Sequence, residues 1–136
     1  MQQLTLESYG KPQLKGCSFS IAHTDNLVCL AISKEGRIGL DCEKHCKINI
    51  NDFQFCFTNA EWQQIEQAAT PISAFYNLWT RKEAMLKAIG CGLIDNLNAI
   101  DVRQDTSFFR QEHWHFCKLQ ISEKYYVHLC TKLEPV

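Results

Sequence analysis

Residues 73–89, SAFYNLWTRKEAMLKAI, carry the pattern that decides the fold. Large apolar side chains recur there at intervals of three and four residues, the spacing that puts them on one face of an α-helix. They are Phe75, Leu78, Trp79, Met85, Leu86 and Ile89. Gly90 and Gly92 follow, and glycine is favoured where a helix ends. The stretch therefore predicts a long helix with a buried face.

The chain before this helix predicts three strands and a shorter helix. Apolar runs bounded by turn residues predict strands at 17–22, 27–33 and 37–43. Turn residues at 25–26 and 34–36 favour antiparallel hairpins between them. Residues 58–61, Thr-Asn-Ala-Glu, form a capping-box pattern, so a helix is expected from there to about Ala69.

The two ends of the chain complete the expected architecture. Strands are expected at 97–103, 114–121 and 124–131, the last two joined by a turn at 122–123. Residues 1–16 include Gly10-Lys11-Pro12 and are expected to form an arm or loop. The fold class is therefore α+β, a single domain over 1–136 with a mainly antiparallel sheet packed against a long helix.

Composition narrows the classes of function. The 136 residues carry 14 Lys and Arg against 15 Asp and Glu, a formal net charge of −1. No global positive field is therefore available to hold nucleic acid or an anionic membrane, and any phosphate binding must be local. Neither a signal peptide nor a membrane-spanning run is recognisable, so we expect a cytoplasmic protein.

Eight cysteines raise the question of disulfides or zinc. The chain has no Cys-x-x-Cys pair, and without an export signal the cysteines should remain thiols, most of them as small core residues. The nearest approach to a metal cluster is Cys42, His45 and Cys46, which has no second ligand pair at the spacing of a zinc site. We therefore expect no zinc site.

Asp41 and Glu43 are the first residues that suggest chemistry. They lie two apart on a predicted strand, so their side chains leave one face about 7 Å apart and repel each other. A solvated edge strand could tolerate that repulsion. A site for Mg²⁺ is the alternative, because that ion takes one or two carboxylates together with substrate phosphates.

Polar residues also interrupt the long helix. Glu83 and Lys87 are one turn apart, and Lys82 lies on the flank of the apolar face. A surface Glu–Lys pair worth about 0.3–0.5 kcal/mol is the simple interpretation, with Lys82 extending past the edge of the core. In the functional alternative, Glu83 completes a three-carboxylate site and the lysines neutralise transferring phosphate.

Two basic residues come from the early chain. Lys11 stands before a proline that stiffens its backbone, and His23 ends a predicted strand. Taken singly, each is typical of a solvated surface residue. Their order along the chain, ahead of the acidic residues, is what suggests a functional role for them.

Taken together, these blocks resemble the successive motifs of the 4′-phosphopantetheinyl transferases, most closely the surfactin-type class. The blocks are Gly10-Lys11-Pro12, Phe19-Ser20-Ile21-Ala22-His23-Thr24, Ile38-Gly39-Leu40-Asp41-Cys42-Glu43, Phe57-Thr58 with Glu61, and the run from Trp79 to Gly90. They stand in the order of the family and cover residues 10 to about 93.

The resemblance implies an activity and assigns roles. Members of that family move the phosphopantetheine arm of coenzyme A to a serine of a carrier protein with Mg²⁺ and release 3′,5′-ADP. Asp41, Glu43 and Glu83 would be metal ligands, and Glu83 would also orient or deprotonate the serine. Lys87 would offset charge on the diphosphate with help from Lys82, and Lys11 and His23 would hold phosphates of coenzyme A.

The chain departs from the surfactin-type pattern in two ways. Ala22 stands where a hydroxyl is usual, and the chain begins close to the start of the second of the two similar halves in those enzymes. Copies of one chain can replace a missing half, as in the trimeric holo-acyl-carrier-protein synthases, so we expect a homo-oligomer, a dimer or trimer, with the site at or near the subunit interface.

Two alternatives remain open at this point. One is a degenerate relative that binds coenzyme A or a partner subunit without catalysis, suggested by Ala22 and the absent half. The other, a metal-dependent nuclease, is disfavoured because the chain has no basic surplus.

Overall fold

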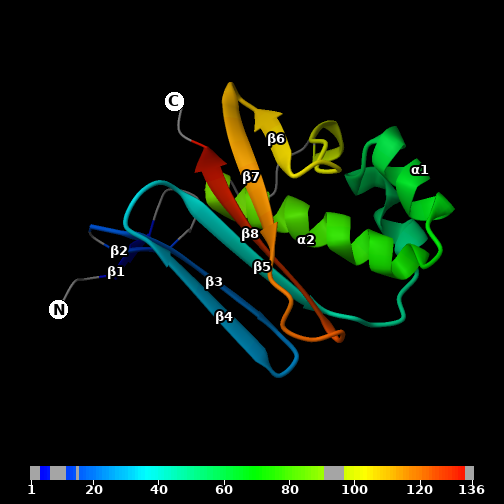
Figure 1. The fold of residues 1–136 in the computed structure, drawn as a ribbon, viewed down its shortest axis with the longest axis horizontal. Coiled ribbons are helices and arrows are strands. Elements are labelled where there is room, and N and C mark those ends of the chain that lie inside the picture. Colours follow the sequence, from blue (N-terminus) through cyan, green and yellow to red (C-terminus); the bar gives the residue numbers. More distant parts are fainter. Residues whose placement is uncertain (1–3, 7–11, 15, 91–96, 134–136) are drawn as a thin grey trace.

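The computed structural model describes residues 4–6, 12–14, 16–90 and 97–133 and has the α+β architecture predicted from the sequence (Figure 1). The elements are β1 (Leu4–Leu6), β2 (Pro12–Leu14), β3 (Ser18–Thr24), β4 (Leu27–Ser33), β5 (Ile38–Lys44), the 3₁₀ helix η1 (Ile50–Cys56), α1 (Asn59–Gln67), α2 (Pro71–Ile89), the 3₁₀ helix η2 (Leu97–Ala99), β6 (Thr106–Phe109), β7 (Glu112–Lys118) and β8 (Tyr125–Leu133). No helix in these described ranges is long and apolar enough to cross a membrane.

Both predicted helices are confirmed. The capping box of α1 is complete, because Thr58 and Glu61 each accept a hydrogen bond from the other's backbone amide. Helix α2 ends at Gly90, which has a left-handed φ of 82° and donates its amide to the carbonyl of Leu86. Arg37 also donates to the carbonyls of Ala88 and Ile89, so the last turn of α2 is tied to the start of β5.

A four-stranded antiparallel sheet packs against α2 in the order β5-β8-β7-β6. The predicted β7–β8 hairpin is confirmed, and β8 places His128 opposite Asp41 and Tyr126 opposite Glu43 on β5. Gly39 lets the helix approach closely, because a Cβ atom there would lie 2.0 Å from the carbonyl oxygen of Ala84. Because successive side chains of a strand point to opposite faces, Asp41 and Glu43 lie on the same face of β5 as Gly39, the face toward α2.

The hairpin β3–β4 covers the other face of β5. Ala22 on β3 lies in an apolar cluster with Leu40 and Cys42 of β5 and Val127 of β8. Ser20 and Thr24 accept hydrogen bonds through their hydroxyls from the amides of Leu40 and Lys44, at 2.9 and 3.2 Å. Hydroxyl groups thus attach β3 alongside β5, and the two strands run in the same direction.

Several sequence expectations are wrong. The hairpin expected across 34–36 does not form, because β5 pairs with β8 instead of β4. Residues 97–103 are not a strand but η2 and an irregular segment, whose backbone groups are bonded by the side chains of Lys82 and Glu61. β6 and η1 were not predicted, and two short paired strands, β1 and β2, occur where an arm or loop was expected.

Candidate active site

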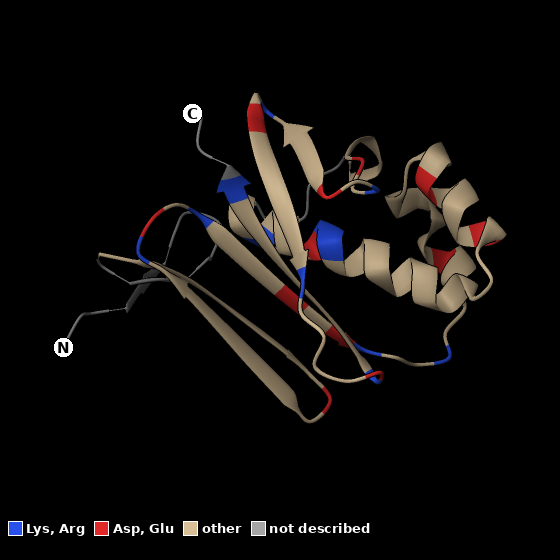
Figure 2. Ribbon diagram, in the orientation of Figure 1, with Lys and Arg blue, Asp and Glu red and all other residues tan. Residues whose placement is uncertain are grey.

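Strand β5 and helix α2 bring together four of the residues singled out from the sequence. Asp41 and Glu43 lie on the face of β5 that packs against α2. Gly39 lies on the same face, and its lack of a side chain lets the helix come close. Glu83 and Lys87 lie one turn apart on α2. Figure 2 shows acidic segments in the lower half of β5 and charged segments along α2. We call Asp41, Glu43, Glu83 and Lys87 the acidic site.

Asp41 is the most buried member of the acidic site, with 6% of its surface exposed. Its Oδ1 lies 3.5 Å from the Nζ of Lys87, whereas its Oδ2 is buried and has no hydrogen-bond partner among the described residues. Burial raises the pKa of Asp41 to about 7, helped by the charges of Glu43 and Glu83 and opposed by Lys87. One carboxylate oxygen is thus left unsatisfied in the interior.

Glu43 and Glu83 respond to the same environment. Burial raises the pKa of both carboxyls, and the ammonium of Lys87 opposes the rise in each case. The charge of Glu43 further raises the pKa of Glu83, while a hydrogen bond involving Trp79 lowers that of Glu43. The three carboxyls therefore interact with one another, and all three are neutralised in part by Lys87.

The oxygen donors of the acidic site suit Mg²⁺ in their chemistry. Magnesium prefers hard oxygen ligands, and the unpartnered Oδ2 of Asp41 is such a donor. Within the described ranges, no three His, Cys, Asp or Glu side chains form a group already arranged to hold a metal ion. In the structure Asp41 is paired with the ammonium of Lys87, so Lys87 occupies the position of a counter-cation beside it.

The hairpin contributes a second contact to the acidic site. Nζ of Lys87 lies 3.4 Å from the carbonyl oxygen of Ile21 on β3. His23, two residues further along β3, is exposed and lies on the same face as Ile21. Ala22 is buried among apolar residues, so a hydroxyl at that position would lie within the hairpin cluster. Lys11 lies outside the described residues.

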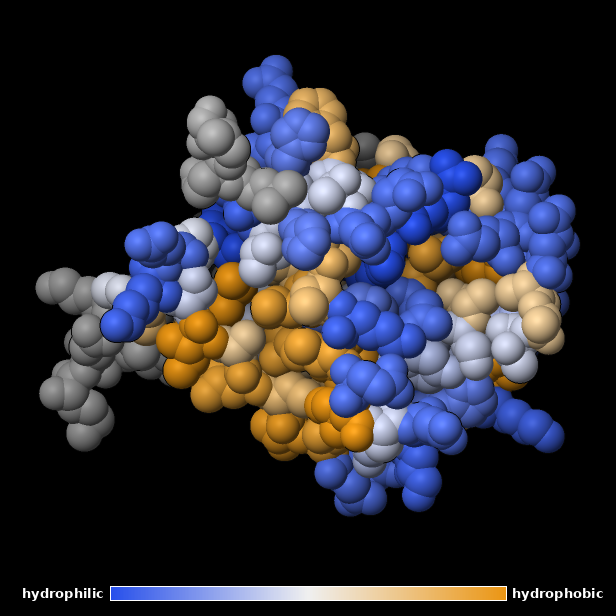
Figure 3. All heavy atoms as spheres, viewed as in Figure 1, coloured by the Kyte–Doolittle hydropathy of each residue, from blue (hydrophilic) through white to orange (hydrophobic). Residues whose placement is uncertain are grey.

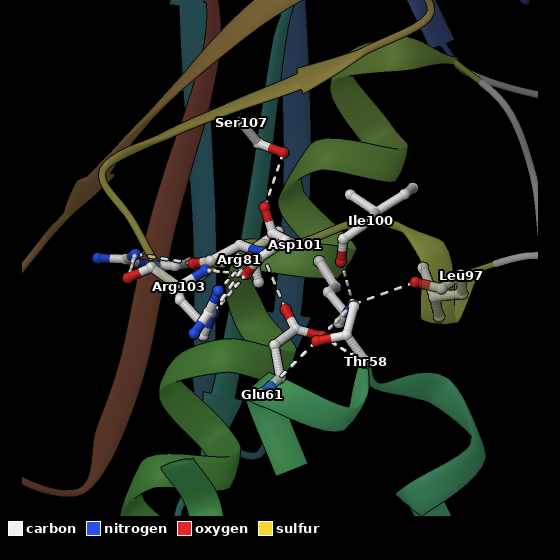
Figure 4. A network of polar contacts seen from close by, with 10 residues as sticks. Thr58, Glu61, Arg81, Leu97, Ile100, Asp101, Arg103 and Ser107 are labelled. Atoms are coloured by element: carbon white, nitrogen blue, oxygen red, sulfur yellow. Dashed lines mark hydrogen bonds and ion pairs between the residues drawn. The ribbon is translucent and has the colours of Figure 1, made fainter. Parts of the chain in front are cut away.

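Lys82 does not join this group, contrary to the role that the sequence suggested for it. Its ammonium is buried 2.8 Å from Oε1 of Glu61 and donates to the carbonyls of Leu97 and Ile100 at 3.1 and 2.5 Å. Figure 4 shows this network around Glu61, with Ile100 and Leu97 on the side toward η2. Burial lowers the pKa of Lys82, and Glu61 opposes that change. Lys82 is thus a structural residue that ties α2 to the segment after it.

Sequence reasoning missed the contacts that hold the site in place. Trp79, identified only as a core residue, interacts with Glu43, and Ser20 holds β3 against β5. The capping-box pattern identified Glu61 but gave no sign of its partner on α2. Cys42 is buried toward the hairpin and Cys46 is exposed. The expectation that Cys42, His45 and Cys46 form no zinc site stays a prediction.

Comparisons with known proteins place the chain in a family. Residues 37–130 match the family described as the 4′-phosphopantetheinyl transferase superfamily. The chain therefore belongs to the 4′-phosphopantetheinyl transferase superfamily, as the sequence motifs implied.

Individual relatives are similar over most of this chain. The 4′-phosphopantetheinyl transferase gsp of Aneurinibacillus migulanus is 36% identical over 109 residues, which cover 76% of this chain and 46% of that protein. The 4′-phosphopantetheinyl transferase Sfp of Bacillus subtilis is 29% identical, with 74% of this chain and 47% of that protein covered. The chain thus spans about half the length of the curated relatives it matches.

A solved structure agrees with the fold. Thermotoga maritima holo-[acyl-carrier-protein] synthase superposes with a TM-score of 0.60 at 13% identity, covering 73% of this chain and 64% of the other. At that identity the similarity establishes the fold alone.

Proposed function

We propose that this chain transfers the 4′-phosphopantetheine arm of coenzyme A to a serine of an acyl or peptidyl carrier protein and releases 3′,5′-ADP. The observation that carries the proposal is the acidic site, in which three mutually repelling carboxyls and Lys87 meet between β5 and α2. Membership of the superfamily supports it, and the four residues of the acidic site stand in the blocks through which the sequence resembles that family. Phosphoryl transfer needs positioning and charge neutralisation more than covalent help.

In this proposal Asp41, Glu43 and Glu83 would hold Mg²⁺. The ion would neutralise charge on the diphosphate of coenzyme A when bound. Glu83 would accept the proton of the serine hydroxyl as its oxygen bonds to the phosphorus that carries pantetheine. The bond from that phosphorus to the bridging oxygen then breaks, and 3′,5′-ADP leaves.

The basic residues take separate parts. Lys87 would exchange its present pairing with Asp41 for the diphosphate, where it offsets negative charge during transfer. His23 is exposed on β3 and would bind a phosphate of coenzyme A, together with Lys11. Lys82 has no part in this transfer, because its three nearest polar partners already engage its ammonium.

We also propose that the chain acts as a homo-oligomer. The acidic site lies beside β3, whose Ile21 and His23 are exposed, so a neighbouring copy seated there would border the site. Most soluble oligomers are closed assemblies of identical chains.

The transfer is tested by mixing the protein with coenzyme A, Mg²⁺ and an apo carrier protein and recording the intact mass of the carrier. We expect the mass gain of one phosphopantetheine arm, and a loss of rate of about 100-fold or more for Glu83→Gln, since transition-state charge and proton transfer each contribute factors of that order. Glu66→Gln, exposed on α1, is the matched control and should retain the wild-type rate.

Two results would contradict the proposal. No mass gain with several carriers, from a protein shown to be folded, would favour a non-catalytic relative that binds coenzyme A or a partner subunit. Full activity of Glu83→Gln would remove the role given to this carboxylate.

A further inference from the structure

The β3–β4 hairpin lies over β5 with its small side chains inward. Cys29 of β4 packs on the apolar cluster that includes Ala22 of β3 and Cys42 of β5. The larger neighbours of Cys29, Val28 and Leu30, are exposed, and Figure 3 shows a hydrophobic surface over the hairpin, in the lower left of the view. Cα atoms of β4 come within 8 Å of Cα atoms of β5. The small inner side chains thus let the two strands lie closer than the roughly 10 Å that usually separates packed sheets.

Hydrogen bonds fix which residues of the hairpin lie over Cys42. The hydroxyls of Ser20 and Thr24 accept from the amides two residues before and two residues after Cys42, respectively. Ala22, midway between these hydroxyls and on the same face of β3, therefore lies beside Cys42. Ala22 is paired with Cys29 across the hairpin. The register thus brings Cys29 and Cys42 to the same level of the two layers.

The turn of the hairpin is fastened to the adjoining end of β5 and β8. The carboxylate of Asp25 pairs with Nζ of Lys44 at 2.8 Å, and the hydroxyl of Tyr125 donates to the carbonyl of Asp25 at 2.9 Å. These contacts oppose sliding of the hairpin along β5, so the two cysteines remain level with each other.

The two thiol groups are in contact and differ in exposure. A hydrogen bond joins the thiol of Cys42 to that of Cys29. Both cysteines are free; Cys42 is 1% exposed, whereas Cys29 is half-buried. A reagent from solvent therefore reaches Cys29 first. Disulfides usually join Cα atoms about 4.4–6.8 Å apart, so strands that pack this closely can accept one after a small inward movement.

We propose that Cys29 and Cys42 form a modification site, which a hydroperoxide converts into a reversible disulfide. The sulfur of Cys29 bonds to one peroxide oxygen and becomes a sulfenic acid, while the other oxygen leaves with the thiol proton as water or an alcohol. The sulfur of Cys42 then bonds to that of Cys29, and the hydroxyl of the sulfenic acid leaves with the proton of Cys42 as water. Two thiols are thus oxidised by two electrons, and one hydroperoxide is reduced.

The disulfide would join the hairpin to the strand that carries two members of the acidic site. Cys42 stands between Asp41 and Glu43, and β3 provides the carbonyl of Ile21 that contacts Lys87. A cross-link restricts the unfolded chain and stabilises the folded one. Oxidation would therefore hold the hairpin against β5 more firmly than the two thiols do.

Peptide mapping under non-reducing conditions tests the site. The protein is treated with an equimolar amount of hydrogen peroxide, the remaining thiols are alkylated after unfolding, and the digest is analysed by mass spectrometry. We expect one cross-linked pair of peptides, which contains Cys29 and Cys42. Dithiothreitol should restore both thiols, because a disulfide is reduced by thiol exchange.

Two variants separate this pair from the other cysteines. Cys29→Ala removes the thiol that is oxidised first and should abolish the cross-link, and Cys42→Ala serves in its place if Cys29→Ala does not fold. Cys117→Ala, at an exposed cysteine of β7, is the matched control and should form the cross-link as the wild type does. Oxidation should raise the Tm of the wild type and of Cys117→Ala, and leave that of Cys29→Ala unchanged.

Three results would overturn the proposal. They are alkylation of both Cys29 and Cys42 after peroxide treatment, a disulfide from either of them to another cysteine, and an oxidised wild type whose Tm is no higher than that of the reduced protein.

The disulfide does not depend on the proposed transfer, since it stands on the register of the hairpin. A chain that forms the cross-link and adds no mass to carrier proteins supports the modification site and contradicts the transferase. A chain that modifies carriers and forms no cross-link supports the transferase and contradicts the modification site.

Discussion

Lys82 and Glu83 are neighbours on α2, yet they belong to regions of opposite character. Lys82 joins a buried network in which both oxygens of Glu61 accept backbone hydrogen bonds, from Thr58 and Val102. Glu83 faces the acidic site, where the ion pair of Asp41 is 3.5 Å long and one carboxylate oxygen has no partner among the described residues. The first region has all its polar groups satisfied; the second does not.

This difference separates charges that hold the fold from charges available to a ligand. A satisfied buried network rigidifies the structure around it, here α1, α2 and the segment after η2 (Figure 4). Partly buried carboxyls with raised pKa values and incomplete partners are typical of functional sites. Substitutions in the two regions should therefore change stability in opposite directions.

The largest effect is expected from Lys82→Met. Removing the ammonium leaves Glu61, which is fully buried, without its cation, and breaking a buried pair in this way typically costs about 3–5 kcal/mol. Urea denaturation should show a loss of that size in the free energy of unfolding.

The double variant Glu61→Gln with Lys82→Met is the control for this prediction. A neutral amide oxygen at position 61 can still accept a backbone hydrogen bond, so part of the loss should be recovered. If the free energy of unfolding of Lys82→Met lies within about 1 kcal/mol of the wild-type value, the network does not hold the fold as argued.

A smaller effect on stability is expected at His128, a buried histidine that is neutral in the folded chain. His128 is 1% exposed, its Nδ1 lies 2.7 Å from Oγ1 of Thr80, and burial, with the charges of Arg81 and Lys118, lowers its pKa to about 3. The unfolded chain takes up this proton near pH 6.5 and the folded chain only near pH 3. Stability should therefore fall as the pH drops through that window, by about 2–4 kcal/mol.

His128→Asn tests the assignment, because its side-chain amide can keep a hydrogen bond to Thr80 without titrating. Urea denaturation from pH 7 to 4 should show a shallower loss of stability in this variant than in the wild type. An unchanged slope would place the acid sensitivity in other groups.

The sequence predicted the local features of the molecule well and the contacts between distant segments less well. Helix α2, the capping box at Thr58 and the β7–β8 hairpin depend on neighbouring residues, and all three are confirmed. The pairing of β5 with β8 joins segments some 85 residues apart, so turn residues at 34–36 wrongly suggested β4 as its partner. Local turn chemistry does not specify such pairings.

The candidate site divides in the same way. Strand periodicity put Asp41 and Glu43 on one face, and helix periodicity put Glu83 and Lys87 one turn apart. The family resemblance implied that the two pairs meet, and the structure brings them together. Lys82 was not placed correctly. Helical spacing put it on the flank of the core, but it could not show that Glu61 and the carbonyl of Ile100 bind its ammonium there. A lysine beside apolar positions can extend to solvent or turn inward to a buried acid, and only the tertiary partner decides.

The smallest effect, and the one of opposite sign, is expected from Asp41→Asn. The pKa of Asp41 is raised from 3.8 to about 7, so the folded chain binds this proton more tightly than the unfolded chain does. Ionisation of Asp41 therefore lowers stability as the pH rises from about 4 to 7, and a neutral amide avoids that loss.

With a chelator at pH 8, Asp41→Asn should raise the Tm by about 3–6 °C, the shift expected for roughly 1 kcal/mol. Asp25→Asn, which breaks the exposed pair with Lys44, is the control and should leave the Tm nearly unchanged. Adding Mg²⁺ should raise the Tm of the wild type and leave that of Asp41→Asn nearly unchanged, because a ligand stabilises only the state that binds it. A variant less stable than the wild type at pH 8, or one that responds equally to Mg²⁺, would mean that the ion pair with Lys87 satisfies Asp41 and that the two regions do not differ as their contacts indicate.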